Sequence, residues 1–92
     1  MTTVWARGRG VAWRRVSGGA VLLPPAADEP ILVTGPGAAV WELLATPSDL
    51  PALAETISTE YGVSADRVGS DLTPFLEALA DCAVVTRSGD DR

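Results

Sequence analysis

The chain has no histidine and no lysine among its 92 residues, and it has one cysteine, Cys82. Histidine is the usual acid–base residue near neutral pH and the commonest metal ligand, so its absence removes the usual basis for catalysis or metal binding. A lone cysteine without a nearby general base is not an activated nucleophile, and we interpret Cys82 as a small buried hydrophobic residue. We therefore expect no catalytic residue, no metal, no cofactor and no enzymatic activity, which leaves binding as the default role.

Positive charge is scarce as well. Residues 1–46 carry four Arg and three acidic residues, for a net charge of +1, whereas residues 47–92 carry three Arg and nine acidic residues, for −6. The glycine-rich segments at 8–19 and 35–37 lack the spacing of a phosphate-binding loop, and no lysine accompanies them. An acidic half repels phosphate, so we expect no nucleic-acid partner.

Long apolar runs are also missing. The longest apolar stretch, residues 20–27, is interrupted by Pro24 and Pro25. We therefore expect no signal peptide, no transmembrane span and no membrane partner. Since one cysteine cannot form an internal disulfide, a reducing compartment fits, and we expect a cytoplasmic protein.

The first half of the chain predicts three strands. Residues 1–10 are polar and glycine-rich, so we expect a flexible N-terminus in which Trp5 is a candidate contact with a partner. Residues 11–16 can form a strand with Val11 and Trp13 on one face, and residues 20–23 are apolar. The two segments flank "SGG", which is typical of a hairpin. Residues 31–34 form the third strand, and its two faces are both apolar.

The second half predicts three helices. Pro36 suits the first turn of one helix, Ser48 or Asp49 can cap the next, and Gly62 can end it. Ser64 can cap a third helix, whose apolar stripe consists of Val68, Leu72, Phe75, Leu76 and Leu79. Pro74 should kink this helix, or the helix restarts at Thr73. Trp13 and Trp41 are expected in the core.

We therefore predict one α+β domain over residues 11–86, with residues 87–92 as a disordered tail. Its expected architecture is winged-helix-like: a three-stranded antiparallel sheet followed by three helices, in the order βββααα.

Three short sequences carry a family resemblance. Residues 40–44 are "VWELL", residues 61–63 are "YGV", and residues 68–79 are "VGSDLTPFLEAL". In this order, after a hairpin and a strand, they resemble the PqqD-like family, also called RiPP recognition elements, over residues 11–85. RiPPs are ribosomally synthesised and post-translationally modified peptides. The family often has glycine where this chain has Ala83, and Asn or Asp-Gly where it has "ATPSD".

The resemblance implies a non-catalytic adaptor that binds the leader of a precursor peptide and delivers it to a modifying enzyme such as a leader peptidase, a cyclase or a radical enzyme. The leader is expected to add a strand to the edge of the third strand and to fill a groove along the third helix. The predicted peptide-binding residues are Pro30, Ile31, Leu32, Val33 and Thr34 on the strand, and Arg67, Val68, Asp71, Leu72, Phe75 and Ala78 on the helix. We expect a monomer or a weak dimer.

Alternatives stay open at this point. The same layout suits a winged-helix DNA-binding domain, although residues 64–82 carry one Arg and four acidic residues, or a module that dimerises through the strand edge. Phe75 belongs either to the core or to the wall of a groove. Arg67 and Asp71 either meet a ligand or form a surface ion pair.

Overall fold

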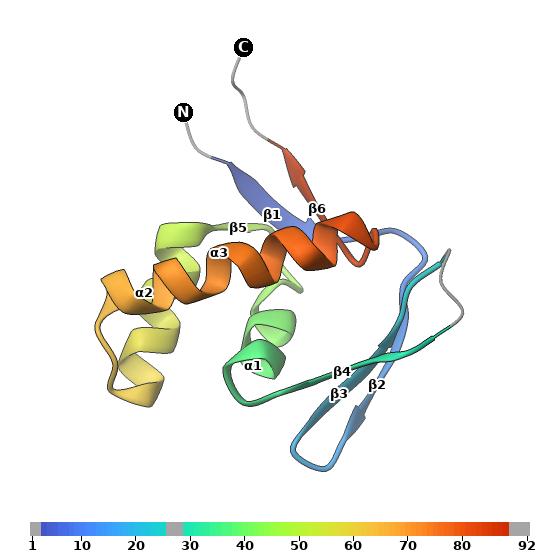
Figure 1. Ribbon diagram of the computed structural model, residues 1–92, viewed down its shortest axis with the longest axis horizontal. Coiled ribbons are helices and arrows are strands. Elements are labelled where there is room, and N and C mark those ends of the chain that lie inside the picture. Colours follow the sequence, from blue (N-terminus) through green and yellow to red (C-terminus); the bar gives the residue numbers. More distant parts are fainter. Residues whose placement is uncertain (1–2, 26–28, 89–92) are drawn as a thin grey trace.

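A computed structural model of the chain describes residues 3–25 and 29–88. Within these ranges it is an α+β protein with two antiparallel three-stranded sheets and three helices (Figure 1). The strand orders are β5-β1-β6 and β2-β3-β4. The elements are β1 (Val4–Arg7), β2 (Ala12–Val16), β3 (Gly19–Leu23), β4 (Ile31–Thr34), α1 (Gly35–Leu43), β5 (Ser48–Asp49), α2 (Leu50–Tyr61), α3 (Ala65–Asp81) and β6 (Val85–Ser88).

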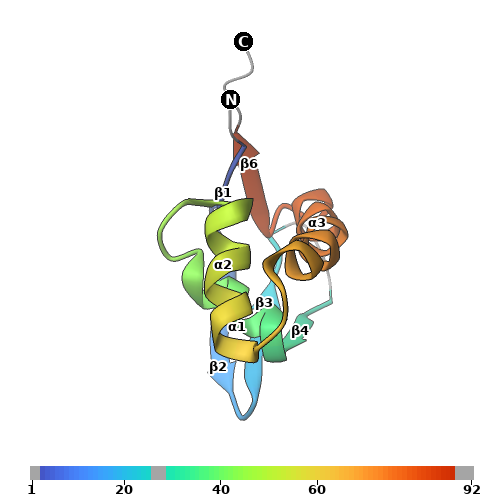
Figure 2. The same ribbon diagram turned by 90° about the vertical axis from the view of Figure 1, so that its left-hand side faces the viewer.

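The β2-β3-β4 sheet confirms the three strands that the sequence predicts. β2 and β3 form a hairpin in which Val16 pairs with Gly19 across a two-residue turn, and Gly18 supplies the positive φ of 79° that such a turn needs. β4 then pairs with β3, with Ala20 opposite Val33. One face of this sheet packs on the helices, and Figure 2 shows the helices standing in front of it.

The helices begin and end where the sequence predicts. Pro36 lies in the first turn of α1. Asp49 caps α2 by accepting a hydrogen bond of 2.8 Å from the N–H of Ala52, and Gly62 ends that helix with a φ of 70°. Ser64 caps α3. None of the described helices combines the length and the apolar character needed to cross a bilayer.

α3 runs without interruption past Pro74, so the helix does not restart at Thr73. The Thr73 hydroxyl donates a hydrogen bond of 2.9 Å to the carbonyl of Gly69, one turn earlier. The buried stripe of α3 consists of Val68, Leu72, Leu76 and Leu79. Proline therefore occupies a position of the helix that points away from the core, and it is exposed.

The prediction of a flexible N-terminus is wrong for residues 4–7. They form β1, the central strand of the β5-β1-β6 sheet, and Trp5 pairs with Ser48 on one side and with Arg87 on the other. The Trp5 side chain is only 5% exposed, so it belongs to the core and is not available to a partner. The order βββααα therefore omits a second sheet.

The predicted C-terminal boundary is also wrong. Arg87 and Ser88 belong to β6, which pairs with β1, and the remaining residues of the expected tail, 89–92, lie outside the described residues. Val84 and Val85 are buried, and Val85 is the first residue of β6. Cys82, which we interpreted as buried, is exposed at the C-cap of α3.

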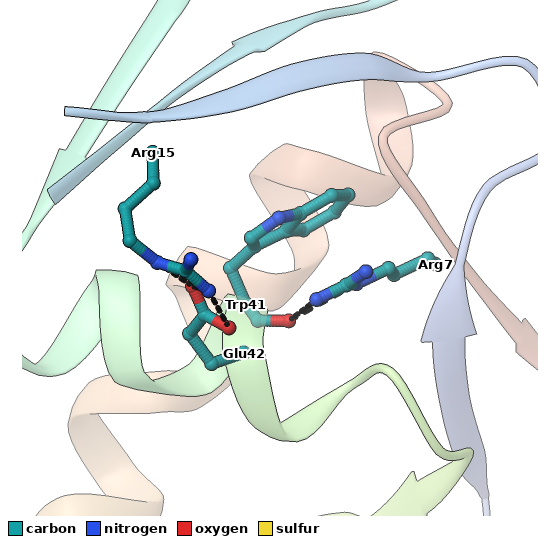
Figure 3. Close-up of polar contacts among 4 residues, drawn as sticks. All are labelled: Arg7, Arg15, Trp41 and Glu42. Atoms are coloured by element: carbon teal, nitrogen blue, oxygen red, sulfur yellow. Dashed lines mark hydrogen bonds and ion pairs between the residues drawn. The ribbon is translucent and has the colours of Figure 1, made fainter.

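Arg7 connects the two sheets. Its Nε and Nη2 atoms donate hydrogen bonds of 3.1 and 2.8 Å to the carbonyl of Trp41 in α1, and Figure 3 shows the Arg7 side chain directed at this carbonyl. Its guanidinium carbon lies 4.8 Å from the centroid of the Trp13 ring in β2 and 4.4 Å from that of Trp41. Both contacts are cation–π interactions, so one side chain from β1 holds a helix and the hairpin together. Arg15 and Glu42 add an exposed ion pair of 2.9 Å between β2 and α1.

Replacing Arg7 with alanine should lower the free energy of unfolding by about 1–3 kcal/mol, because two charged hydrogen bonds to one carbonyl and two cation–π contacts are lost together. Arg9→Ala is the matched control, since Arg9 is exposed and no hydrogen bond or ion pair involves it among the described residues. Urea denaturation measures both. Equal stability of the two variants would show that Arg7 does not connect the sheets.

Ala83 is the one non-glycine residue with positive φ in the described chain, at 63°, and it stands where the family pattern often has glycine. An L-residue in this conformation is strained by roughly 1–2 kcal/mol. Ala83→Gly should therefore raise the melting temperature, by a free energy of about 1 kcal/mol after the entropy of the more flexible unfolded chain is subtracted. Thermal unfolding followed by circular dichroism measures the shift, and a lower melting temperature would contradict the assignment of strain.

Candidate functional site

β4 has a neighbour on one side only. In the described chain it pairs with β3 and with no other strand. The strand is four residues long, with Pro30 before it and the first turn of α1 after it. Its free edge is therefore a short row of backbone groups with no partner in the sheet.

The hairpin determines which groups these are. A two-residue turn closes on a hydrogen-bonded pair, here Val16 and Gly19, so the backbone groups of Gly19 point toward β2. The backbone groups of Ala20 therefore point toward β4. The backbone groups of its partner, Val33, point toward β3. In agreement, a Cβ added at Gly19 would collide with the Val33 carbonyl oxygen.

The alternation of the ladder then leaves Leu32 and Thr34 with their backbone groups directed away from β3. Thr34 is the N-cap of α1, so its carbonyl accepts the first bond of the helix. What remains for a new strand is the N–H and carbonyl of Leu32, the N–H of Thr34 and the carbonyl of Pro30.

A hollow of about 380 Å³ lies beside this edge. It is bounded by β4, by the first turn of α1 and by the middle of α3. Its lining residues are mainly apolar: Leu32, Val33, Thr34, Pro36, Gly37, Asp71, Leu72 and Phe75. A strand added to β4 would direct every second side chain into this hollow, because side chains alternate between the two faces of a sheet.

Pro36 and Gly37 are lining residues that the sequence analysis did not predict. The Phe75 ring lies over Gly37, so that a Cβ added there would be 3.1 Å from the ring's Cζ atom. Glycine at this position therefore lets the ring approach the backbone of α1 closely. A glycine inside the first turn of a helix was the available signal, because glycine often marks such an approach.

The structure brings six of the predicted site residues together around the hollow: Leu32, Val33, Thr34, Asp71, Leu72 and Phe75. The other five are not among its lining residues. Val68 is buried at 6% exposure within the core, and Ile31 is half-buried on the helix-facing side of β4. Pro30, Arg67 and Ala78 are exposed.

Arg67 and Asp71 form the ion pair that their spacing allows. Arg67 Nε lies 3.6 Å from Asp71 Oδ2, and the side chains are 73% and 70% exposed. A pair this exposed adds little to stability. Asp71 thus supplies a negative charge beside the apolar hollow, and Arg67 partly neutralises it.

A larger hollow, of about 580 Å³, lies between α2 and α3. All of its lining residues belong to the two helices, among them Ala54, Gly69 and Ser70. None of its described lining residues belongs to a strand, so they provide no unpaired strand backbone to hold an extended chain. For this reason the smaller hollow at β4 is the better candidate site.

An open sheet edge beside an apolar hollow is the geometry that peptide-binding domains use to accept an added strand. The family model described as "Coenzyme PQQ synthesis protein D (PqqD)" matches residues 19–85, and the chain belongs to the PqqD family. The chain is also similar to the solution NMR structure of the PqqD truncation of Methylobacterium extorquens PqqCD, described as a functional and stand-alone RiPP recognition element. The two share 26% sequence identity over 91% of this chain and 89% of that chain, with a TM-score of 0.74. No curated protein matches the chain.

Phe75 and Leu76 are adjacent in α3 but differ in burial. Leu76 is 0% exposed in the core, whereas Phe75 is half-buried and lines the hollow. Leu76→Ala should lower the free energy of unfolding by about 2–5 kcal/mol, the usual range for a core leucine. Phe75→Ala should lower it by less, despite the larger side chain removed, because one side of the ring already faces solvent. Chemical denaturation compares them, and a greater loss for Phe75→Ala would make Phe75 a core residue.

Proposed function

We propose that this protein is a RiPP recognition element that binds the leader of a precursor peptide by strand addition to β4. The observation that carries the proposal is the row of unpaired backbone groups at Leu32 and Thr34, with an apolar hollow directly beside it. Family membership and the likeness to a stand-alone recognition element support the same role.

The hollow has to contribute to affinity. A backbone hydrogen bond adds about 0.5–1.5 kcal/mol net, so the four groups left at the edge provide less than the roughly 8 kcal/mol that micromolar binding needs. Ordering a flexible peptide costs further free energy. Apolar side chains of the leader, at about 1.5–3 kcal/mol each when fully buried, supply the difference by packing against Leu72 and Phe75.

The leader's alternate residues then have separate roles. Residues opposite Ile31 and Val33 share the helix-facing side of the sheet and enter the hollow. The residue opposite Leu32 faces the other side. We expect the bound leader to present the precursor to a modifying enzyme, with the recognition element making no chemical step of its own.

Leu32→Pro should abolish leader binding without unfolding the protein. Proline removes the outward N–H and places a ring in the path of the incoming strand, while the ladder to β3 keeps its bonds because the lost N–H does not face β3. Leu32→Ala keeps the N–H and should bind at least tenfold more tightly than Leu32→Pro. Fluorescence anisotropy with a labelled synthetic leader peptide measures both.

Ile31→Pro is the contrasting variant. Its N–H faces β3, opposite Leu22, so proline there should break the protein's own sheet and lower the melting temperature strongly. Leader binding that persists in Leu32→Pro would rule out strand addition at this edge. Salt-sensitive DNA binding, or a mass that rises with concentration without any peptide affinity, would favour the DNA-binding or the dimerisation alternative.

A further inference from the structure

The face of the β2-β3-β4 sheet that points away from the helices is apolar and open. Leu23 and Leu32 on this face are 43% and 63% exposed. Val21 lies between them, paired with Leu32 across the ladder and two residues from Leu23 along β3. Apolar side chains of two adjacent strands are therefore exposed side by side on this face.

This outer face contains a hollow of about 300 Å³ at the end of the sheet near Pro30. Its lining is apolar apart from one charged residue: Ala12, Trp13, Arg14, Val21, Leu23 and Pro30. Arg14 is exposed and forms no ion pair with an acidic residue of the described chain. The hollow therefore suits an apolar side chain that has a negative charge close to it.

The area of the face decides against a second copy as its occupant. Three strands about 4.8 Å apart and five residues long cover only about 240 Å². A stable protein–protein interface needs roughly 800 Å² from each partner. A short peptide segment, in contrast, can be held by one hollow when its neighbouring residues are already bound.

The hollow reaches the residue that precedes β4. Pro30 lines it, and Pro30 is also where an added strand must leave the ladder, because proline has no N–H to offer. The Leu32 side chain lies on the same outer face, one pair further along the strand. A peptide that pairs with Leu32 and runs on past Pro30 therefore arrives at this hollow.

We propose that the peptide bound at β4 continues beyond Pro30 onto the outer face of the sheet and places an apolar side chain in this second hollow, with an acidic residue beside it facing Arg14. This inference rests on the proposed function and specifies the peptide further. The leader is recognised on both faces of the sheet, by apolar residues that enter the hollow at α3 and by an apolar–acidic pair outside the paired segment.

A displayed library of random peptides about 16 residues long is sufficient to cover the ladder and its continuation. Selection on the wild-type protein, with counter-screening on Leu32→Pro, isolates the peptides that depend on strand addition.

Synthetic representatives should carry an apolar residue whose replacement by alanine weakens binding to the wild-type protein about tenfold or more. The same replacement should have little effect on binding to Leu23→Ser, which already lacks that contact. Selection on Arg14→Glu should enrich Lys or Arg where the wild type enriches Asp or Glu.

Val63→Ser is the matched control, because Val63 is 40% exposed in the loop between α2 and α3, and it should bind the selected peptides as the wild type does. Peptides that are lost on Leu32→Pro but bind Leu23→Ser and Arg14→Glu unchanged would overturn the second hollow and leave strand addition intact. If no selected peptide distinguishes Leu32→Pro from the wild type, strand addition itself fails.

Discussion

The ladder between β3 and β4 is the interaction on which the functional account depends. Its register, with Ala20 opposite Val33, commits the backbone groups of Ile31 and Val33 to the protein's own sheet. The same register leaves those of Leu32 and Thr34 facing outward. A shift by one residue would exchange these roles and would also turn Val33 out of the core, where it is 5% exposed. Core packing therefore determines which backbone groups face outward at this edge.

An open edge is a risk for aggregation, and this one is limited by its surroundings. β4 has only four residues; Pro30 precedes it, and α1 starts at Gly35, which has a φ of 56°. A second β4 edge could pair with it only over this short length. Arg7 and the Trp13–Trp41 contact, with ring centroids 5.7 Å apart, hold the hairpin sheet against the helices. The candidate site is therefore a short strand edge beside a helix.

Local signals in the sequence predict much of this fold. Turn glycines, helix caps and apolar periodicity locate the hairpin, β4 and all three described helices, whereas the free edge of β4 and its helical neighbour were expected from the family resemblance. The β5-β1-β6 sheet was missed because its pairs are distant in sequence. Trp5 pairs with Arg87, and no local pattern in "TTVWARG" reveals a partner so far along the chain.

The site was predicted only in part, also for physical reasons. Helical periodicity places Val68 and Leu72 on the same side of α3, and both are buried in the core, but only the structure shows that Leu72 also borders the hollow whereas Val68 does not. Gly37 matters because it has no side chain, so the Phe75 ring can approach the backbone of α1. Patterns of apolar and charged residues in the sequence do not reveal this role. The apolar sequence "ILV" indicated an apolar outer face, because both faces of the strand are apolar and only one of them packs on the helices.

Hydrogen exchange of the β4 amides, followed by NMR, tests the central claim most directly. In the free protein the amides of Leu32 and Thr34 should exchange rapidly, whereas those of Ile31 and Val33 should be protected by the ladder to β3. Addition of a bound leader peptide should make the Leu32 and Thr34 amides slow and change Ile31 and Val33 little. A Leu32 amide that is already protected in the free protein, or that stays fast when the peptide is bound, would contradict strand addition at this edge.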